Sequence, residues 1–235
     1  VEVPKEIGSK YQKDSPFSEV HAMNVGFRHS SGKFFARIDQ DTLIGERFVD
    51  WFYNKFHETP YIQWPLVAFS GRRNLSPEQS KDYKDWVFDY DKSMSVELCH
   101  PNAYYSRVIP HRKKMFSFYG AAVGVMIVER ELYLKHMGFN ESLIYMNNMD
   151  TEFLNRLAKD TKFVNLGLRT EADFYHLHHP RGEGAANDLS QPHLDTDGIR
   201  KTNSNEIRKG IENTNPEDWG LNSEQLSVNN FSDKS

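Results

Sequence analysis

Apolar residues fall into short blocks along the chain, and the spacing within each block alternates between helical and extended. Residues 17–31 carry a broad apolar set and are followed by Gly32, a common helix stop, which predicts a helix. Residues 34–38 form a short apolar run typical of a strand. The apolar residues of 43–56 recur near helical spacing, and the apolar and aromatic run 61–70 favours another strand.

The same alternation returns in the second half of the chain. Residues 121–128 are small and β-branched, as in a buried strand, and 129–137 predicts a short helix. Residues 150–158 place their apolar side chains on one helical face, and 163–168 favours a strand. Strands that alternate with helices indicate an α/β fold whose sheet is covered on both faces.

Two stretches depart from this pattern. Residues 72–114 are polar with interleaved aromatic residues, and we interpret them as an insertion that packs over the body. Residues 182–235 are rich in Gly, Asn, Asp, Ser and Thr, and they predict a polar, partly disordered extension with one helix at 206–212. Within this extension, Trp219 is expected to pack back on the body as an anchor.

The composition argues against some classes of protein. The formal net charge of −4 gives no basic face for nucleic acid, and no apolar run approaches the ~20 residues of a membrane span. The single cysteine, Cys99, excludes an internal disulfide and favours a reducing compartment such as the cytoplasm. The start, Val1 to Pro4, resembles the end of a buried strand, so we expect the fold to be incomplete there and any targeting segment to lie upstream.

The first candidate for chemistry is Asp39-Gln40-Asp41, directly after the predicted strand 34–38. Ligands of open α/β sheets bind beyond the carboxyl ends of strands. Two carboxylates one residue apart can converge on Mn²⁺ or Mg²⁺, which would neutralise the charge of a diphosphate. Taken alone, however, the triplet favours a common Asp-rich turn.

The residues before this triplet favour a ligand site over an Asp-rich turn. His21-Ala22-x-Asn24-x-Gly26 is followed by Ser31-Gly32-Lys33-Phe34 and then by the Asp pair. This order and spacing resemble the family-2 glycosyltransferases. The resemblance implies a GT-A-like, Rossmann-related mixed sheet with helices on both faces, spanning residues 1–181 and lacking its first nucleotide-binding strands, with 72–114 on the acceptor side.

The resemblance also implies that Asn24 and Gly26 lie near the nucleotide. The alternatives are that Asn24 is a helix-surface residue and that Gly26 allows close packing.

A second match lies between residues 120 and 156. A strand of small residues leads to Gly138-Phe139-Asn140-Glu141 and then to Asp150-Thr151-Glu152. The family's Glu-Asp pair would fall on Met149 and Asp150, so its first acid is missing. The resemblance implies that Asp150 is the catalytic base, with Glu152 a weaker candidate. Alternatively both are first-turn acids that stabilise a helix N-terminus, which we favour for Glu152.

The third match is His176-Leu177-His178-His179. Alternate residues of an extended segment share a face, and histidine is a frequent metal ligand. The resemblance implies that a late histidine completes the metal site begun by the Asp pair. We favour His176, with His178 as the other candidate, whereas a single histidine would more often be structural.

Together these features predict a metal-dependent, inverting transfer of a sugar from a nucleotide-sugar donor to a glycan or other hydroxyl acceptor. One alternative is a metal-dependent phosphodiesterase or hydrolase, which would not require the helix that carries Asn24 and Gly26. The other is a non-catalytic glycan- or partner-binding domain on a degenerate transferase scaffold. Met149, in place of the expected acid, favours that second alternative.

Overall fold

The computed structural model forms two compact units, each described below by itself. It describes residues 1–12, 18–54, 67–70, 72–83, 107–110, 116–119, 124–144, 149–157, 160–161, 163–166, 174–178 and 215–228. Unit 1 comprises residues 1–33, 133–156 and 182–235, and unit 2 comprises 34–132 and 157–181. Most of the predicted 72–114 insertion, Cys99 and the predicted helix at 206–212 lie outside the described residues.

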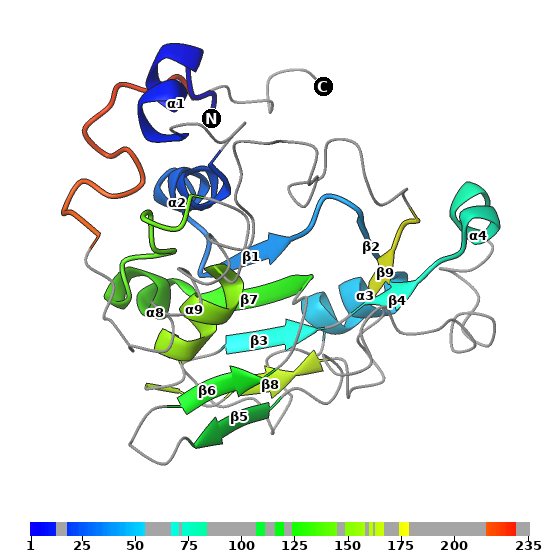
Figure 1. The fold of residues 1–235 in the computed structure, drawn as a ribbon. Coiled ribbons are helices and arrows are strands. Elements are labelled where there is room, and N and C mark those ends of the chain that lie inside the picture. Colours follow the sequence, from blue (N-terminus) through cyan, green and yellow to red (C-terminus); the bar gives the residue numbers. More distant parts are fainter. Residues whose placement is uncertain are drawn as a thin grey trace, which may run out of the picture. The chain divides into compact units, whose positions relative to one another are not determined.

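The main sheet of unit 2 is mixed, as the sequence predicted. Its order is β1 (Phe34–Ile38), β7 (Val125–Glu129), β3 (Val67–Ser70) and β8 (Phe163–Asn165), drawn side by side in Figure 1. Strand β7 is antiparallel to both β1 and β3, and β8 is parallel to β3. Strands β1, β3 and β8 therefore run in one direction, and their carboxyl ends share one edge.

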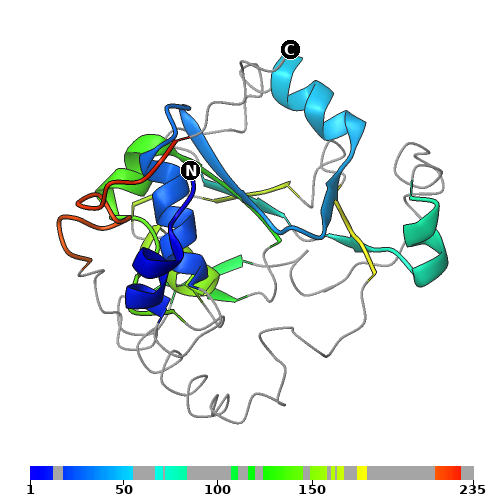
Figure 2. The same ribbon diagram turned by 90° about the horizontal axis from the view of Figure 1, so that it is seen from above.

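A second sheet continues from that edge. It consists of β2 (Thr42–Ile44), β9 (Phe174–His176) and β4 (Arg73–Asn74), with β9 in the middle. Figure 2 shows these strands from above, with β2 in blue, β4 in teal and β9 in yellow. Strand β9 is antiparallel to β2 and parallel to β4. The chain thus passes from the first sheet to the second directly after β1 and again directly after β3. Strands β5 (Arg107–Pro110) and β6 (Phe116–Tyr119) form a separate antiparallel pair.

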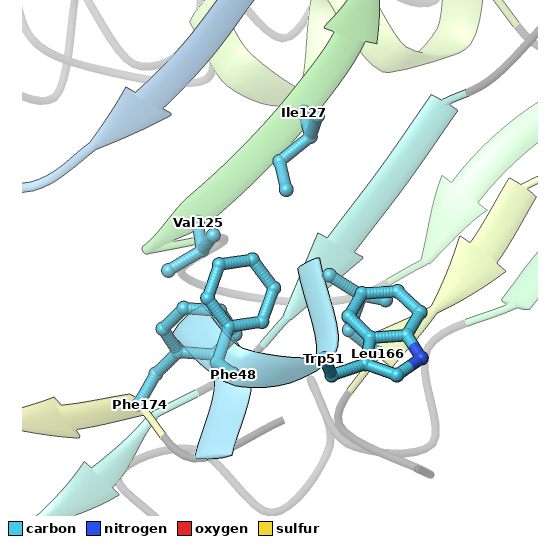
Figure 3. Close-up of a cluster of buried hydrophobic side chains, with 6 residues drawn as sticks. All are labelled: Phe48, Trp51, Val125, Ile127, Leu166 and Phe174. Carbon is cyan, nitrogen blue, oxygen red and sulfur yellow. The ribbon is translucent and has the colours of Figure 1, made fainter. Parts of the chain in front are cut away.

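Helix α3 (Glu46–Asn54) is held to unit 2 by a buried apolar cluster. Helical spacing places Phe48 and Trp51 on the buried face of α3, and the ring of Phe48 lies 4.6 Å from that of Phe174. Figure 3 shows the members of the cluster: Phe48, Trp51, Val125, Ile127, Leu166 and Phe174. The helix begins later than predicted because residues 42–44 form β2. Helix α4 (Pro77–Lys81) follows β4.

Unit 1 is built from helices and loops. It contains α1 (Lys5–Gln12), α2 (Glu19–Arg28), the end of α8 (Arg130–Lys135) and nearly all of α9 (Met149–Leu157). The expected end of a buried strand at Val1 to Pro4 was wrong. Val1 is exposed, Glu2 makes only an isolated bridge to Ser227, and Pro4 accepts the first hydrogen bonds of α1. Within the described ranges, no helix combines the length and apolarity that crossing a membrane requires.

A buried asparagine organises unit 1. Asn24 of α2 is 0 % exposed and makes four hydrogen bonds, the full capacity of its amide. Its Nδ2 donates to the carbonyl of Phe139 and to Glu141, each at 2.9 Å. Its Oδ1 accepts from the backbone N–H of Phe139 and from the hydroxyl of Tyr133. Asn24 thereby ties α2 to the Gly138–Glu141 loop, so the alternative of a helix-surface residue was wrong.

The segment 215–228 packs against the same loop. The side chain of Asn215 donates to the carbonyls of Met137 and Phe139 and accepts from the N–H of Glu141. Trp219 is 4 % exposed and lies beneath the guanidinium of Arg28, 4.0 Å from its ring centroid. The prediction that Trp219 anchors the C-terminal extension is therefore confirmed within unit 1.

Asn24 and Gly26 give a matched pair of substitutions on one helix. We expect Asn24→Ala to lower the free energy of unfolding by about 3 kcal/mol, because it leaves several buried polar groups unpaired. We expect Gly26→Ala to raise it by up to about 1 kcal/mol, because open space surrounds the added methyl and alanine favours a helix. Denaturant unfolding of both variants measures these changes, and an unchanged midpoint for Asn24→Ala would contradict the assigned role.

Candidate functional site

The two aspartates lie where the topology of unit 2 brings several strand ends together. Asp39 and Asp41 follow β1, and Arg72 follows β3. Gly124 precedes β7, which runs between those strands in the opposite direction, so it lies between the two carboxyl ends. The backbone N–H of Asp39 donates to the carbonyl of Gly124 at 3.0 Å. The predicted placement of the Asp pair at the carboxyl edge of a sheet is confirmed.

The side chain of Arg72 joins the two aspartates. Its Nη1 donates to Oδ1 of Asp41 and to Oγ1 of Thr42, the latter at 2.8 Å. Its Nη2 lies 3.3 Å from Oδ2 of Asp39. A second guanidinium, that of Arg37 in β1, lies 2.9 Å from the other oxygen of Asp39. The two carboxylates are thus held by two arginines, one from β1 and one that follows β3 on the other side of β7.

Gly124 makes room for this arrangement. A Cβ atom on residue 124 would overlap the Nε, Cδ and Cζ atoms of Arg72. The side chain of Arg72 therefore takes its course toward Asp39 and Asp41 across a position that carries no side chain. Any larger residue at position 124 would displace the guanidinium.

His176 completes the cluster from the second sheet. It ends β9 opposite Thr42, and the N–H of Leu177 donates to the carbonyl of Asp41 at 2.8 Å. This pairing brings Nε2 of His176 to 2.9 Å from Oδ2 of Asp41. His178 lies beyond the strand, exposed, and its backbone N–H donates to Ser80. The structure therefore brings His176, and not His178, to the acidic pair.

The carboxylates face solvent more than the arginines do. The side chains of Asp39 and Asp41 are 26 % and 25 % exposed, against 9 % for Arg37 and 7 % for Arg72. Burial raises the pKa of Asp41, but the charges and hydrogen bonds of Arg72 and His176 outweigh it and hold that pKa below its ordinary value. Asp41 is therefore ionised at neutral pH.

The expected metal site does not fit this arrangement. Carboxylate oxygens and an imidazole are suitable donors for Mn²⁺ or Mg²⁺. Yet in the part of the chain that the structure describes, no three acidic, histidine or cysteine side chains gather as metal ligands. The guanidinium of Arg72 contacts both carboxylates in the place where a bridging cation is expected. The metal dependence stays a prediction.

The other candidate residues belong to unit 1. The contacts of Asn24 serve the fold, and open space at Gly26 shows that close packing does not require glycine there. Glu152 is 6 % exposed and forms a bidentate ion pair with Arg156, at 2.6 and 3.0 Å. Glu152 lies in the first turn of α9, as the favoured alternative had it, and its carboxylate pairs with Arg156, a structural contact that the sequence did not predict. Asp150 lies half-buried in the first turn of α9, and its role as base stays a prediction.

Sequence reasoning missed three members of the cluster: Arg37, Arg72 and Gly124. The available signals were slight. Arg37 is a cation inside an apolar strand, where a charge must find a partner. Arg72 follows an apolar run, just as the Asp pair does, and Gly124 ends a run of small residues. Only the strand order shows that these positions meet.

Comparisons with known proteins leave the family open. No protein-family model matches the chain, and no curated protein matches it. One solved structure with partial similarity is the catalytic domain of Drosophila β1,4-galactosyltransferase 7, solved in complex with xylobiose. The sequences are 16 % identical, the TM-score is 0.37, and the match covers 69 % of this chain. It spans 52 % of the Drosophila domain, about half its length, and similarity at this level does not define the function of this chain.

The lowered pKa of Asp41 has a consequence for stability. Above the ordinary carboxyl pKa of about 3.9, the ion pairs of Asp41 contribute fully to the free energy of unfolding. This contribution is lost as the pH falls through the lowered pKa that Asp41 has in the folded state. We expect Asp41→Asn to be less stable than the wild type at pH 7, with the difference shrinking below pH of about 4. Denaturant unfolding of both proteins across this range measures it. A difference independent of pH would contradict the assigned pairing.

Proposed function

We propose that this protein is a glycosyltransferase that moves a sugar from a nucleoside-diphosphate sugar to a hydroxyl acceptor. One observation carries the proposal: Asp39-Gln40-Asp41 and His176, which are far apart in the sequence, meet at the carboxyl edge of a mixed sheet. The resemblance to the family-2 glycosyltransferases implied that a late histidine joins the Asp pair to complete a metal site. Ligands of α/β sheets commonly bind at this edge.

The cluster provides groups that suit a sugar donor. Ionised carboxylates accept several hydrogen bonds, and those of Asp39 and Asp41 are partly exposed. We propose that these two carboxylates accept hydrogen bonds from the hydroxyl groups of the donor. Arg72 and His176 supply hydrogen-bond donors close to the carboxylates, where they would stabilise the negative charge of the departing diphosphate. The ion pairs fix these groups before a ligand binds, so little reorganisation is needed.

Asp150 is the proposed general base. Its carboxylate takes the proton from the acceptor hydroxyl while that oxygen attacks the anomeric carbon. The new carbon–oxygen bond forms as the bond to the diphosphate breaks, and the nucleoside diphosphate leaves with the electron pair. Attack from the face opposite the leaving group inverts the anomeric configuration, and no covalent enzyme intermediate forms. The mechanism assigns no step to Mn²⁺ or Mg²⁺.

A non-catalytic glycan-binding domain is the second candidate. Met149, which stands where the family carries its first acid, is 6 % exposed, so it occupies a core position. A domain of this kind would bind sugars without turning them over. The hydrolase alternative would use a metal-bound water.

A panel of nucleotide sugars tests the proposal, with Asp150→Asn as the key variant and Glu131→Gln as its control. Glu131 is an exposed acid of α8, so its substitution removes a comparable charge from the surface. We expect turnover of one donor by the wild type and by Glu131→Gln. Asp150→Asn should lower kcat by at least about 100-fold, because general bases contribute on that order, and should change KM for the donor little.

One outcome would contradict the enzyme, and another would contradict only the role of Asp150. Saturable sugar binding without turnover of any donor, and indifferent to Asp150→Asn, would favour the binding domain. Turnover that Asp150→Asn leaves unchanged would retain the transferase but would remove Asp150 as its base.

A further inference from the structure

We propose that Arg72 is the built-in counter-cation of Asp39 and Asp41, and that it excludes a divalent cation from this acidic pair. The inference deepens the proposed function and rests on it, because it states which cation serves the donor site. It starts from a disagreement: the sequence motif predicts a metal ion between the two carboxylates, whereas a guanidinium contacts both of them.

The contacts on the carboxylate oxygens support this role. All four oxygens have a cationic or imidazole partner: Asp39 faces Arg37 and Arg72, and Asp41 faces Arg72 and His176. A divalent cation would need the same oxygens at about 2.0–2.6 Å. It would then lie within a few ångströms of a guanidinium that is permanently charged, in a place where solvent screens the repulsion poorly.

The charges of the cluster also disfavour a divalent cation at the acidic pair. In the described part of the chain, the negative charges of Asp39 and Asp41 are paired with the positive charges of Arg37 and Arg72. A bare divalent cation would leave this partly buried cluster with two uncompensated positive charges, which is unfavourable. A metal-binding acidic pair would need an excess of negative charge, and the described residues of this cluster do not supply it.

Arg72 is also anchored as a fixed part of the fold. Its side chain is 7 % exposed, it donates to Oγ1 of Thr42 in addition to the carboxylates, and it lies across Gly124. A surface arginine that swings away from an incoming metal would need none of these features. The absence of a side chain at position 124 leaves the space that Arg72 occupies.

Binding of Mn²⁺ alone, followed by electron paramagnetic resonance without nucleotide, tests the inference. We expect weak binding by the wild type, by Arg72→Lys, which keeps a cation in place, and by Lys81→Met, which removes an exposed cation of unit 2. Arg72→Met should bind one Mn²⁺ on the order of tenfold or more tightly, because it leaves two carboxylates without their shared counter-charge. Adding Asp41→Asn to Arg72→Met should abolish the gain.

Gly124→Ala provides an independent route to the same result. Its methyl group would displace the Arg72 side chain without removing the charge, so we expect tighter Mn²⁺ binding there too. Tight Mn²⁺ binding by the wild type would overturn the inference, whether or not any variant folds. Unchanged or weaker binding by folded Arg72→Met would overturn it as well. Failure of the proposed function is a separate result, because it is measured as absent sugar turnover and not as Mn²⁺ affinity.

Discussion

The ion pair between Arg72 and the two aspartates is the interaction on which the candidate site depends. Asp39 and Asp41 carry like charges one residue apart, and without a counter-charge they would repel each other. The guanidinium of Arg72 contacts both and is itself buried. Strand order makes this possible, because β1 and β3 run in the same direction on either side of β7 and so end at one edge. Gly124, at the start of β7, leaves the path between them open. The sheet topology, the glycine and the ion pair therefore form one structural arrangement.

Each unit is organised around a buried polar group that makes several hydrogen bonds. In unit 1 it is the amide of Asn24, and in unit 2 it is the guanidinium of Arg72. A buried polar group is costly unless all its partners are present, so it selects one arrangement of the surrounding backbone. The two networks differ in how much of their surface is exposed. The four partners of Asn24 are all internal, whereas the partners of Arg72 are carboxylates with part of their surface exposed. Of these two networks, only the second leaves part of its charged surface exposed to solvent.

The sequence predicted what depends on local pattern. The strand at 34–38, a helix predicted over 17–31 and observed at 19–28, the placement of the Asp pair and the burial of Trp219 all follow from nearby residues. It did not predict the roles of Arg72 and Gly124, because their contact with the Asp pair depends on strand order, which no local spacing records. The motif match drew attention to Asn24 for a ligand, whereas its hydrogen bonds reach a loop more than one hundred residues away and serve packing. The start of the chain resembled a strand by composition, but a helix follows it directly.

The central claim is that the edge cluster binds a sugar donor with arginine as its resident cation. A crystal structure of the protein with a nucleoside-diphosphate sugar, grown in the presence of Mn²⁺, tests this most directly. The account predicts sugar or ribose hydroxyls on Asp39 and Asp41, the diphosphate beside Arg72 and His176, and Arg72 still paired with both aspartates. A donor bound elsewhere, or a Mn²⁺ ion held by the two aspartates with Arg72 turned away, would contradict it.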